Sequence, residues 1–198
     1  DWPAGGPGWD DLFWPFQSLL KEGLTNDGDP DGSDPDNQIA SVFARLVIPG
    51  AGAELYGEYA REDHNWNLRD LALEPDHNSA YVIGMAKGWD RGGDQAVWLR
   101  GEVLNARVSA LRRVRGQTPF YRHSRMRQGH THVGQILGAA SGYGGAHARL
   151  QADLYHPGGR YSAALVRSRH LMPPTSGPQS ITTDEDVSYA LEMGGRWF

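Results

Sequence analysis

Residues 146–170 read AHARLQADLYHPGGRYSAALVRSRH, and the first ten alternate between apolar and polar side chains. Side chains that alternate with a period of two point to opposite sides of a β-strand. The PGGR that follows is a tight-turn sequence, and residues 160–170 form a second alternating segment. The stretch therefore predicts a β-hairpin with one apolar and one polar face. In its first strand these faces carry Ala146, Ala148, Leu150, Ala152 and Leu154 on one side, and His147, Arg149, Gln151, Asp153 and Tyr155 on the other.

The same alternation recurs along most of the chain. It predicts further strands at residues 38–48, 53–63, 79–89, 95–107 and 186–198. The tight-turn sequences PGAG and RGGD join two pairs of these strands, and 26 glycines with 10% aromatic residues favour β structure. Residues 108–145 do not alternate cleanly and are interpreted as a long structured loop, although residues 128–138 could carry a strand. We expect an all-β chain of about seven antiparallel strands.

The predicted connections alternate in length. Counting back from Phe198, residues 172–184, 108–145 and 64–78 are long, whereas PGGR, RGGD and PGAG are short. Membrane β-barrels have short turns on the periplasmic side and longer loops outside, and their strands of about ten residues cross the bilayer at a tilt. The pattern predicts one transmembrane β-barrel domain over residues 1–198, with barrel strands in residues 38–198. The aromatic Phe198 at the end of an alternating strand is typical of such barrels, although Trp197 continues the apolar face here.

Seven strands cannot close a barrel of the bacterial type, which has an even number of at least eight. The chain also starts at Asp1, without an initiator methionine or a signal peptide. We expect the C-terminal portion of a larger barrel, whose remaining N-terminal strands are its partner. Because an open sheet has two unpaired edges, we expect this portion to be unstable as a soluble monomer. A soluble β-sandwich has similar alternation and is the alternative fold.

The composition limits the function. The net charge of −5 gives no basic excess for binding nucleic acid, and the absence of cysteine excludes disulfides and thiolate sites. No apolar run approaches the roughly 18 residues of a membrane-spanning helix. A mean hydropathy of −0.57 is compatible with a barrel, whose apolar and polar residues alternate. No cofactor is predicted.

Residues 1–37 form a lead-in to the first strand. Asp10 or Asp11 could cap a short helix that ends at Leu24. Residues 26–38 then match the start of a calcium-binding loop, but Gln38 stands where such a loop has a bidentate glutamate. A solvated acidic loop is the alternative to a calcium site.

Several uncommon sequence motifs in the loops resemble those of the capsule assembly Wzi family. They are REDH at residues 61–64, LRDLALEPDH at 68–77, YRHS at 121–124 and QGHTHVGQILG at 128–138. Similarity also covers DWPAGGPGWDDLF at the start of the chain and runs to about Arg169. The resemblance implies an outer-membrane β-barrel that is not an enzyme. It implies a surface lectin that binds capsular or related exopolysaccharide and helps to attach or assemble it at the cell surface.

The two longest loops carry side chains suited to an acidic saccharide, because arginine and protonated histidine bind carboxylates and aromatic rings pack on sugar faces. The predicted topology puts both loops on one side of the membrane. Their acidic residues Asp63, Asp70 and Asp76 are interpreted as structural partners of the arginines. The polysaccharide-binding candidates are Arg61, His64, Trp66, Arg69, His77, Tyr121, Arg122, His123, Gln128, His130, His132 and Gln135.

Two other functions are compatible with the residues. His130 and His132 have the spacing of a zinc pair but need a third ligand such as His123, and the neighbours Glu62/Asp63 and Glu74/Asp76 suggest a glycoside hydrolase. A porin-like channel without a polysaccharide role is the remaining alternative, and it requires an open lumen. The lipid of the outer membrane is a partner under either barrel hypothesis.

Overall fold

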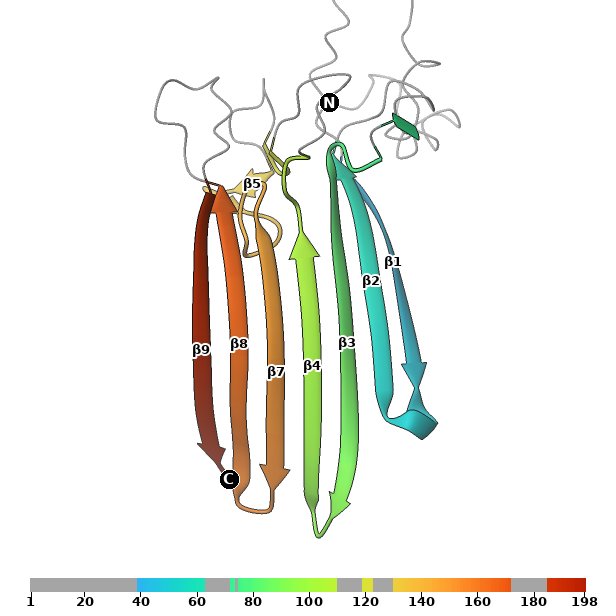
Figure 1. Cartoon of the computed structure of the whole chain (residues 1–198), viewed down its shortest axis with the longest axis vertical. Helices are drawn as coiled ribbons and strands as arrows, with labels where there is room; N and C mark the ends of the chain where they lie inside the picture. Colours follow the sequence, from blue (N-terminus) through green and yellow to red (C-terminus); the bar gives the residue numbers. More distant parts are fainter. Residues whose placement is uncertain (1–38, 63–71, 74, 110–118, 123–129, 172–184) are drawn as a thin grey trace, which may run out of the picture.

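The computed structural model describes residues 39–62, 72–73, 75–109, 119–122, 130–171 and 185–198. These residues form one antiparallel seven-stranded sheet and a two-stranded hairpin (Figure 1). The sheet is an up-and-down meander, since each strand pairs with the next long strand in the chain. Its strands are β1 (Ile39–Ile48), β2 (Ala53–Glu62), β3 (Ser79–Gly92), β4 (Gln95–Asn105), β7 (Ala146–His156), β8 (Gly159–Leu171) and β9 (Glu185–Trp197). All seven predicted strands are confirmed, with small differences at their ends.

The largest of these differences is at the end of β3, which continues beyond the predicted residue 89 to Gly92. Gly93 and Asp94 both have positive φ, of 61° and 59°, which is the geometry of a two-residue type I′ turn. Such a turn fits the twist of the flanking strands, so pairing continues to Gly92 and Gln95 with a register shift after Asp90. The strand is longer than predicted because Arg91 and Gly92 belong to β3, where Gly92 pairs with Gln95, and only Gly93 and Asp94 form the turn.

Short and long connections lie at opposite ends of the sheet. Pro49–Ala51 forms a 3₁₀ turn between β1 and β2, and Pro157 and Gly158 join β7 to β8 at the same end (Figure 1). The long connections leave from the other end, here called the loop end. The only strands described between β4 and β7 are β5 (Thr131–His132) and β6 (Gln135–Ile136). A further long strand within residues 128–138 would have exchanged the loop and turn ends, and the described part of this segment, from residue 130 on, forms only this short hairpin.

The described residues do not form a sandwich, because no second large sheet packs on the seven strands. They also do not form a closed barrel, since β1 and β9 are the two edges of the sheet. The predicted N-terminal helix and the acidic loop at residues 26–38 lie outside the described residues. Within the described part of the chain, no helix has the length and apolar character needed to cross a membrane.

The register divides the sheet into two unlike faces. One row across the sheet carries Leu46, Leu55, Met85, Gly101, Leu150, Leu165 and Leu191, and we call this side the outer face. The neighbouring row points to the other side, the inner face, and carries Arg45, Tyr56, Gly84, Glu102, Arg149, Val166 and Ala190. The alternation predicted from sequence is thus in register across all seven strands.

The outer face is an exposed apolar band bordered by aromatic side chains. Leu165 is 59% exposed and Leu191 is 62% exposed, although water-soluble sheets bury such residues. Aromatic rings flank the band, with Tyr59, Tyr81 and Tyr189 near the loop end and Trp89, Tyr161 and Trp197 near the turn end.

The height of this band follows from the strands. Tyr81 and Trp89 are eight residues apart in β3, as are Tyr189 and Trp197 in β9. Eight residues of about 3.4 Å span about 27 Å along a strand, or about 21 Å across a membrane at a tilt of about 40°. This is close to the apolar band of about 25 Å that membrane barrels present to lipid.

Candidate functional site: the cavity between the inner face and the loop

The loop after β4 returns to the inner face of the sheet. Phe120, which is 2% exposed, packs there against Ala80 and Ala106. The backbone N–H of Tyr121 donates a hydrogen bond to the Glu62 carboxylate at the end of β2. A buried ring and a charge-assisted hydrogen bond thus fix this loop over β1–β4.

Tyr121 organises the segment that follows. Its hydroxyl accepts a hydrogen bond from the Ala139 N–H at 3.2 Å, and its ring stacks on His130 with centroids 6.2 Å apart. The His130 N–H in turn donates to the Tyr121 carbonyl at 3.1 Å. The ring also lies against Gly138, where an added Cβ would come within 2.4 Å of it. Tyr121 and His130 are therefore held in one fixed arrangement.

A cavity of about 790 Å³ lies between this loop and the inner face of β1–β4. Such a volume is within the range of about 300–1,000 Å³ for small-ligand sites, and it could hold a few sugar units. Loop side chains and strand side chains contribute to the same cavity. Its aromatic and polar walls include Phe43, Arg45, Glu54, Tyr56, Glu58, Glu102, Phe120, Tyr121 and His130.

The polar floor of the cavity is pre-organised. The Tyr56 hydroxyl donates to the Glu102 carboxylate across Gly84, because all three residues are in one row of the sheet. The Tyr56 ring lies directly over Gly84, where a Cβ would come within 2.0 Å of Cζ. Arg45 binds Glu54 through two hydrogen bonds of 2.8 and 2.9 Å. These pairs hold carboxylate oxygens towards the cavity in defined positions.

A second polar network covers the inner face of β4, β7 and β8. The Asp153 carboxylate has no exposed side-chain surface, and it pairs with Arg100 and, at 2.7 Å, with Arg160. The Gln151 amide donates to both oxygens of Asp153, at 2.9 and 3.0 Å. Gln151 also accepts from Arg149 at 3.1 Å. A buried carboxylate that is fully hydrogen-bonded in this way fixes the side chains around it.

Two of the predicted binding residues, Arg61 and His77, are buried at the loop end. Arg61 points to the outer face, and its guanidinium donates to the carbonyl of His77 at 2.9 Å and to the Tyr59 hydroxyl at 3.1 Å. His77 is 1% exposed. The Asp76 carboxylate accepts a hydrogen bond from Ser109 at 2.6 Å. These contacts favour a role in holding the turn at residues 75–78, and they leave little surface on Arg61 or His77 for a ligand.

The predicted residues of the second loop are divided between the cavity and the solvent. Tyr121 and His130 line the cavity. His132 and Gln135 are exposed opposite each other at the tip of the β5–β6 hairpin. Arg122 is half-buried, and its N–H donates to the Pro119 carbonyl at 2.9 Å. His64, Trp66, Arg69, His123 and Gln128 lie outside the described residues.

The zinc hypothesis needs three ligands close together. Among the described residues, no three histidine, cysteine or acidic side chains are close enough to hold a metal ion. His123, the third ligand suggested by the sequence, lies outside the described residues. His130 stacks on Tyr121, whereas His132 is exposed at the hairpin tip.

The strand residues of the cavity were not predicted as site residues from the sequence. They are Arg45, Glu54, Tyr56, Glu58 and Glu102. The available signal was their parity, because all five alternate along their strands with residues of the outer face. The alternation does not predict which part of the inner face the loop covers.

Comparisons of the chain with known protein families, with curated proteins and with solved structures found no match.

Proposed function

We propose that this chain is part of a β-barrel of the bacterial outer membrane, and that the cavity under its loop binds surface polysaccharide. The role would be that of a lectin, which helps to attach or assemble capsular or related exopolysaccharide at the cell surface. The resemblance of the loop sequences to the capsule assembly Wzi family suggests this function. The observation that carries it is the combination of an outward apolar band with an inward cavity of aromatic and carboxylate side chains.

The outer face supports the membrane part of the proposal. Large apolar side chains such as Leu191 and Met193 are more than half exposed, and aromatic rings border them at both ends of the strands. Lipid would cover this surface at no hydrophobic cost. The short turns at one end and the long loops at the other also agree with a barrel whose loops face outwards.

The strand directions support closure by further strands. β1 and β9 are both edges, and both run from the loop end to the turn end (Figure 1). A second copy in the same membrane orientation would therefore join β9 to β1 in parallel, which antiparallel barrels do not use. An odd number of additional antiparallel strands would close the sheet, and the total would then be even.

The cavity supports the saccharide part of the proposal. Sugars have apolar C–H faces that pack on aromatic rings, and their hydroxyl groups donate to planar carboxylates. Tyr121 supplies a ring from the loop, and Glu58 and Glu102 supply carboxylates from the strands. His130 would add a ring nitrogen that can hydrogen-bond a saccharide hydroxyl or carboxylate.

The test uses the protein purified from membranes in detergent and the polysaccharide of its own cell. His130→Ala is compared with His132→Ala, because the two histidines are neighbours but only His130 lines the cavity. We expect the His130 variant to weaken binding about tenfold, the equivalent of one charge-assisted hydrogen bond. The His132 variant should bind like the original protein.

Each other outcome points to a different function. Unchanged binding in both variants would remove the cavity from the site. Weaker binding in the His132 variant alone would move the site to the hairpin tip. Shortening of the polysaccharide during incubation, abolished by Glu102→Gln, would indicate a hydrolase. No binding, together with single-channel conductance in planar bilayers, would favour the porin-like alternative.

A further inference from the structure

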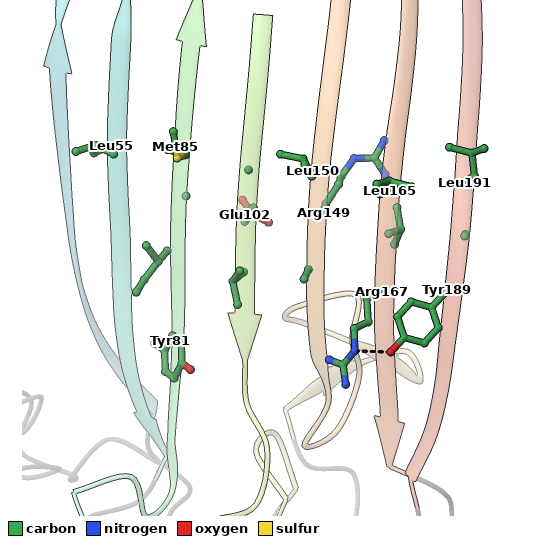
Figure 2. A pocket seen from close by; sticks show the side chains of 17 residues that line it. Leu55, Tyr81, Met85, Glu102, Arg149, Leu150, Leu165, Arg167, Tyr189 and Leu191 are labelled. Atoms are coloured by element: carbon green, nitrogen blue, oxygen red, sulfur yellow. Dashed lines mark hydrogen bonds between the residues drawn. The ribbon is translucent and has the colours of Figure 1, made fainter.

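The outer face carries a groove that the proposed lectin function does not use. Its volume is about 970 Å³, and its walls are almost entirely apolar (Figure 2). Outer-face side chains of β2, β3, β4, β7, β8 and β9 line it, including Leu55, Met85, Leu150, Leu165 and Leu191. Glu102 and Arg149 also border the groove, but their side chains belong to the inner face, where Arg149 pairs with Glu192 at 2.7 Å.

Among the outer-face residues that line the groove, one position has no side chain. Gly101 of β4 stands in the row between Met85 and Leu150. A Cβ at Gly101 would make only ordinary contacts, 3.7 Å from Met85 and 3.8 Å from Leu150. The space is therefore not closed by the neighbours, and an extended hydrocarbon chain could occupy it.

At the loop end, the groove meets a cluster of guanidinium groups. Arg107, Arg167 and Arg169 line a small hollow of about 180 Å³, which shares Tyr81 and Val103 with the groove. Glu185 pairs with Arg107 at 2.9 Å and also with Arg169. Among the described residues, this corner thus has three arginines, but its ion pairs include only the carboxylate of Glu185. The hollow therefore carries excess positive charge.

Arg167 is the arginine that Glu185 does not reach. Its Nε donates to the Tyr189 hydroxyl at 3.3 Å, and its guanidinium points towards the loop ends of the strands (Figure 2). The same guanidinium lies over the Tyr189 ring, 5.9 Å from the centroid. A charge on a lipid-facing surface is costly near the middle of a membrane and much less costly near its edge, where an anion can compensate it.

We propose that this corner binds a phosphate-bearing lipid, with the phosphate in the hollow of Arg107, Arg167 and Arg169 and an acyl chain in the groove over Gly101. The inference rests on the proposed placement of the outer face in lipid. One guanidinium can donate two parallel hydrogen bonds to two oxygens of a phosphate. A hollow bounded by three guanidinium groups therefore suits a phosphate. The adjoining groove distinguishes a lipid from free phosphate, because only a lipid would fill both.

The experiment uses the protein purified from membranes, freed of bound lipid and studied by native mass spectrometry in detergent. The probes are lipid A with two phosphates, lipid A with both phosphates removed, and inorganic phosphate. We expect preferential binding of the phosphorylated lipid, and no displacement of it by inorganic phosphate. Arg167→Gln should weaken that binding about tenfold, because one charge-assisted contact is lost.

Two further variants complete the design. Gly101→Leu fills the groove and should weaken binding of the phosphorylated lipid without affecting the charge cluster. Arg91→Gln is the matched control, since Arg91 is an exposed arginine of β3 at the opposite, turn end of the sheet. Its lipid binding should equal that of the original protein. Circular dichroism and the electrophoretic shift on heating check that each variant is folded.

Three results would overturn the inference. They are equal binding of the two forms of lipid A, unchanged binding in the Arg167 variant, and displacement of the lipid by inorganic phosphate. A chain that fractionates with the aqueous phase of its own cells would overturn the membrane placement as well. A chain that stays in the membrane but shows one of the three results would overturn the lipid site alone.

Discussion

The two faces of this sheet invert the usual relation between polarity and burial. On the inner face, Asp153 is 1% exposed, whereas on the outer face Met193 is 79% exposed. Both residues are in the same sheet and follow the same alternation, so the backbone cannot explain the difference. In water, burial of the carboxylate and exposure of the thioether chain would both be unfavourable. If lipid covers the outer face, as proposed, the comparison has a simple explanation: the outer face meets an apolar solvent, and the inner face a polar interior.

The largest expected effect comes from a charge placed on one face or the other. Leu191 and Ala190 are neighbours in β9 and point to opposite faces. If lipid covers the outer face, Leu191→Arg should lower the free energy of unfolding by about 3 kcal/mol, because a guanidinium near the membrane centre is poorly solvated. Ala190→Arg should change it by less than about 1 kcal/mol, since water and Glu192 are available on the inner face. Urea unfolding from lipid vesicles, followed by tryptophan fluorescence, measures both values.

Equal changes in the free energy of unfolding for the two arginine variants would contradict this contrast between the faces, because they would mean that both faces meet the same solvent. A larger effect at Ala190 would reverse the comparison, because the inner face would then be the face that tolerates a charge less well.

The second effect concerns the buried carboxylate of the inner face. Asp153→Ala leaves Arg100 and Arg160 close together without their shared partner. Removing one member of a buried ion pair costs several kcal/mol, but the Arg100 and Arg160 side chains are 42% and 35% exposed and can recruit water. We therefore expect a loss of about 2 kcal/mol in the same unfolding measurement. Asp153→Asn keeps the shape of the side chain and some of its hydrogen bonds, so this variant should lose less stability. A larger loss of stability in the Asn variant than in the Ala variant would contradict an electrostatic role.

Alternation and turn chemistry predicted the sheet because both are local. The period of two in residues 146–156 and the PGGR turn identify β7 and β8 without any knowledge of distant contacts. Connection lengths then gave the meander order and the two ends of the sheet. The same reasoning kept residues 128–138 out of the sheet, because another long strand would have exchanged the loop and turn ends.

The cavity could not be predicted in this way because it depends on contacts between distant segments. Phe120 packs on Ala80, and Tyr56 reaches Glu102 across another strand. The resemblance pointed to sequence motifs in the loops, but the residues of these motifs have unlike surroundings. Arg61 and His77 are buried, whereas Tyr121 and His130 line the cavity. Residue type and spacing do not distinguish a loop arginine that holds a turn from one that meets a ligand.

The smallest effect compares two glycines, one on each face of neighbouring strands. At Gly84 on the inner face, a Cβ would come within 2.0 Å of the Tyr56 ring, so the ring must move away from Glu102. At Gly101 on the outer face, the nearest atoms would be 3.7 Å away. Gly84→Ala should therefore destabilise the protein by roughly 1–2 kcal/mol, in the lower part of the usual range for overpacking. Gly101→Ala should be neutral or stabilising by up to about 1 kcal/mol, because alanine restricts the unfolded strand and adds apolar surface.

The sign of the difference between the two glycine variants is informative. The inner glycine makes room for a hydrogen-bonded aromatic ring, whereas the outer glycine leaves a groove that protein atoms do not fill. If Gly84→Ala is tolerated, the Tyr56–Glu102 contact is dispensable and the floor of the cavity is less fixed than described. If Gly101→Ala destabilises the protein in lipid vesicles but not in detergent, the groove is occupied in the membrane. The second result would connect the outer face to a bound acyl chain through a stability measurement alone.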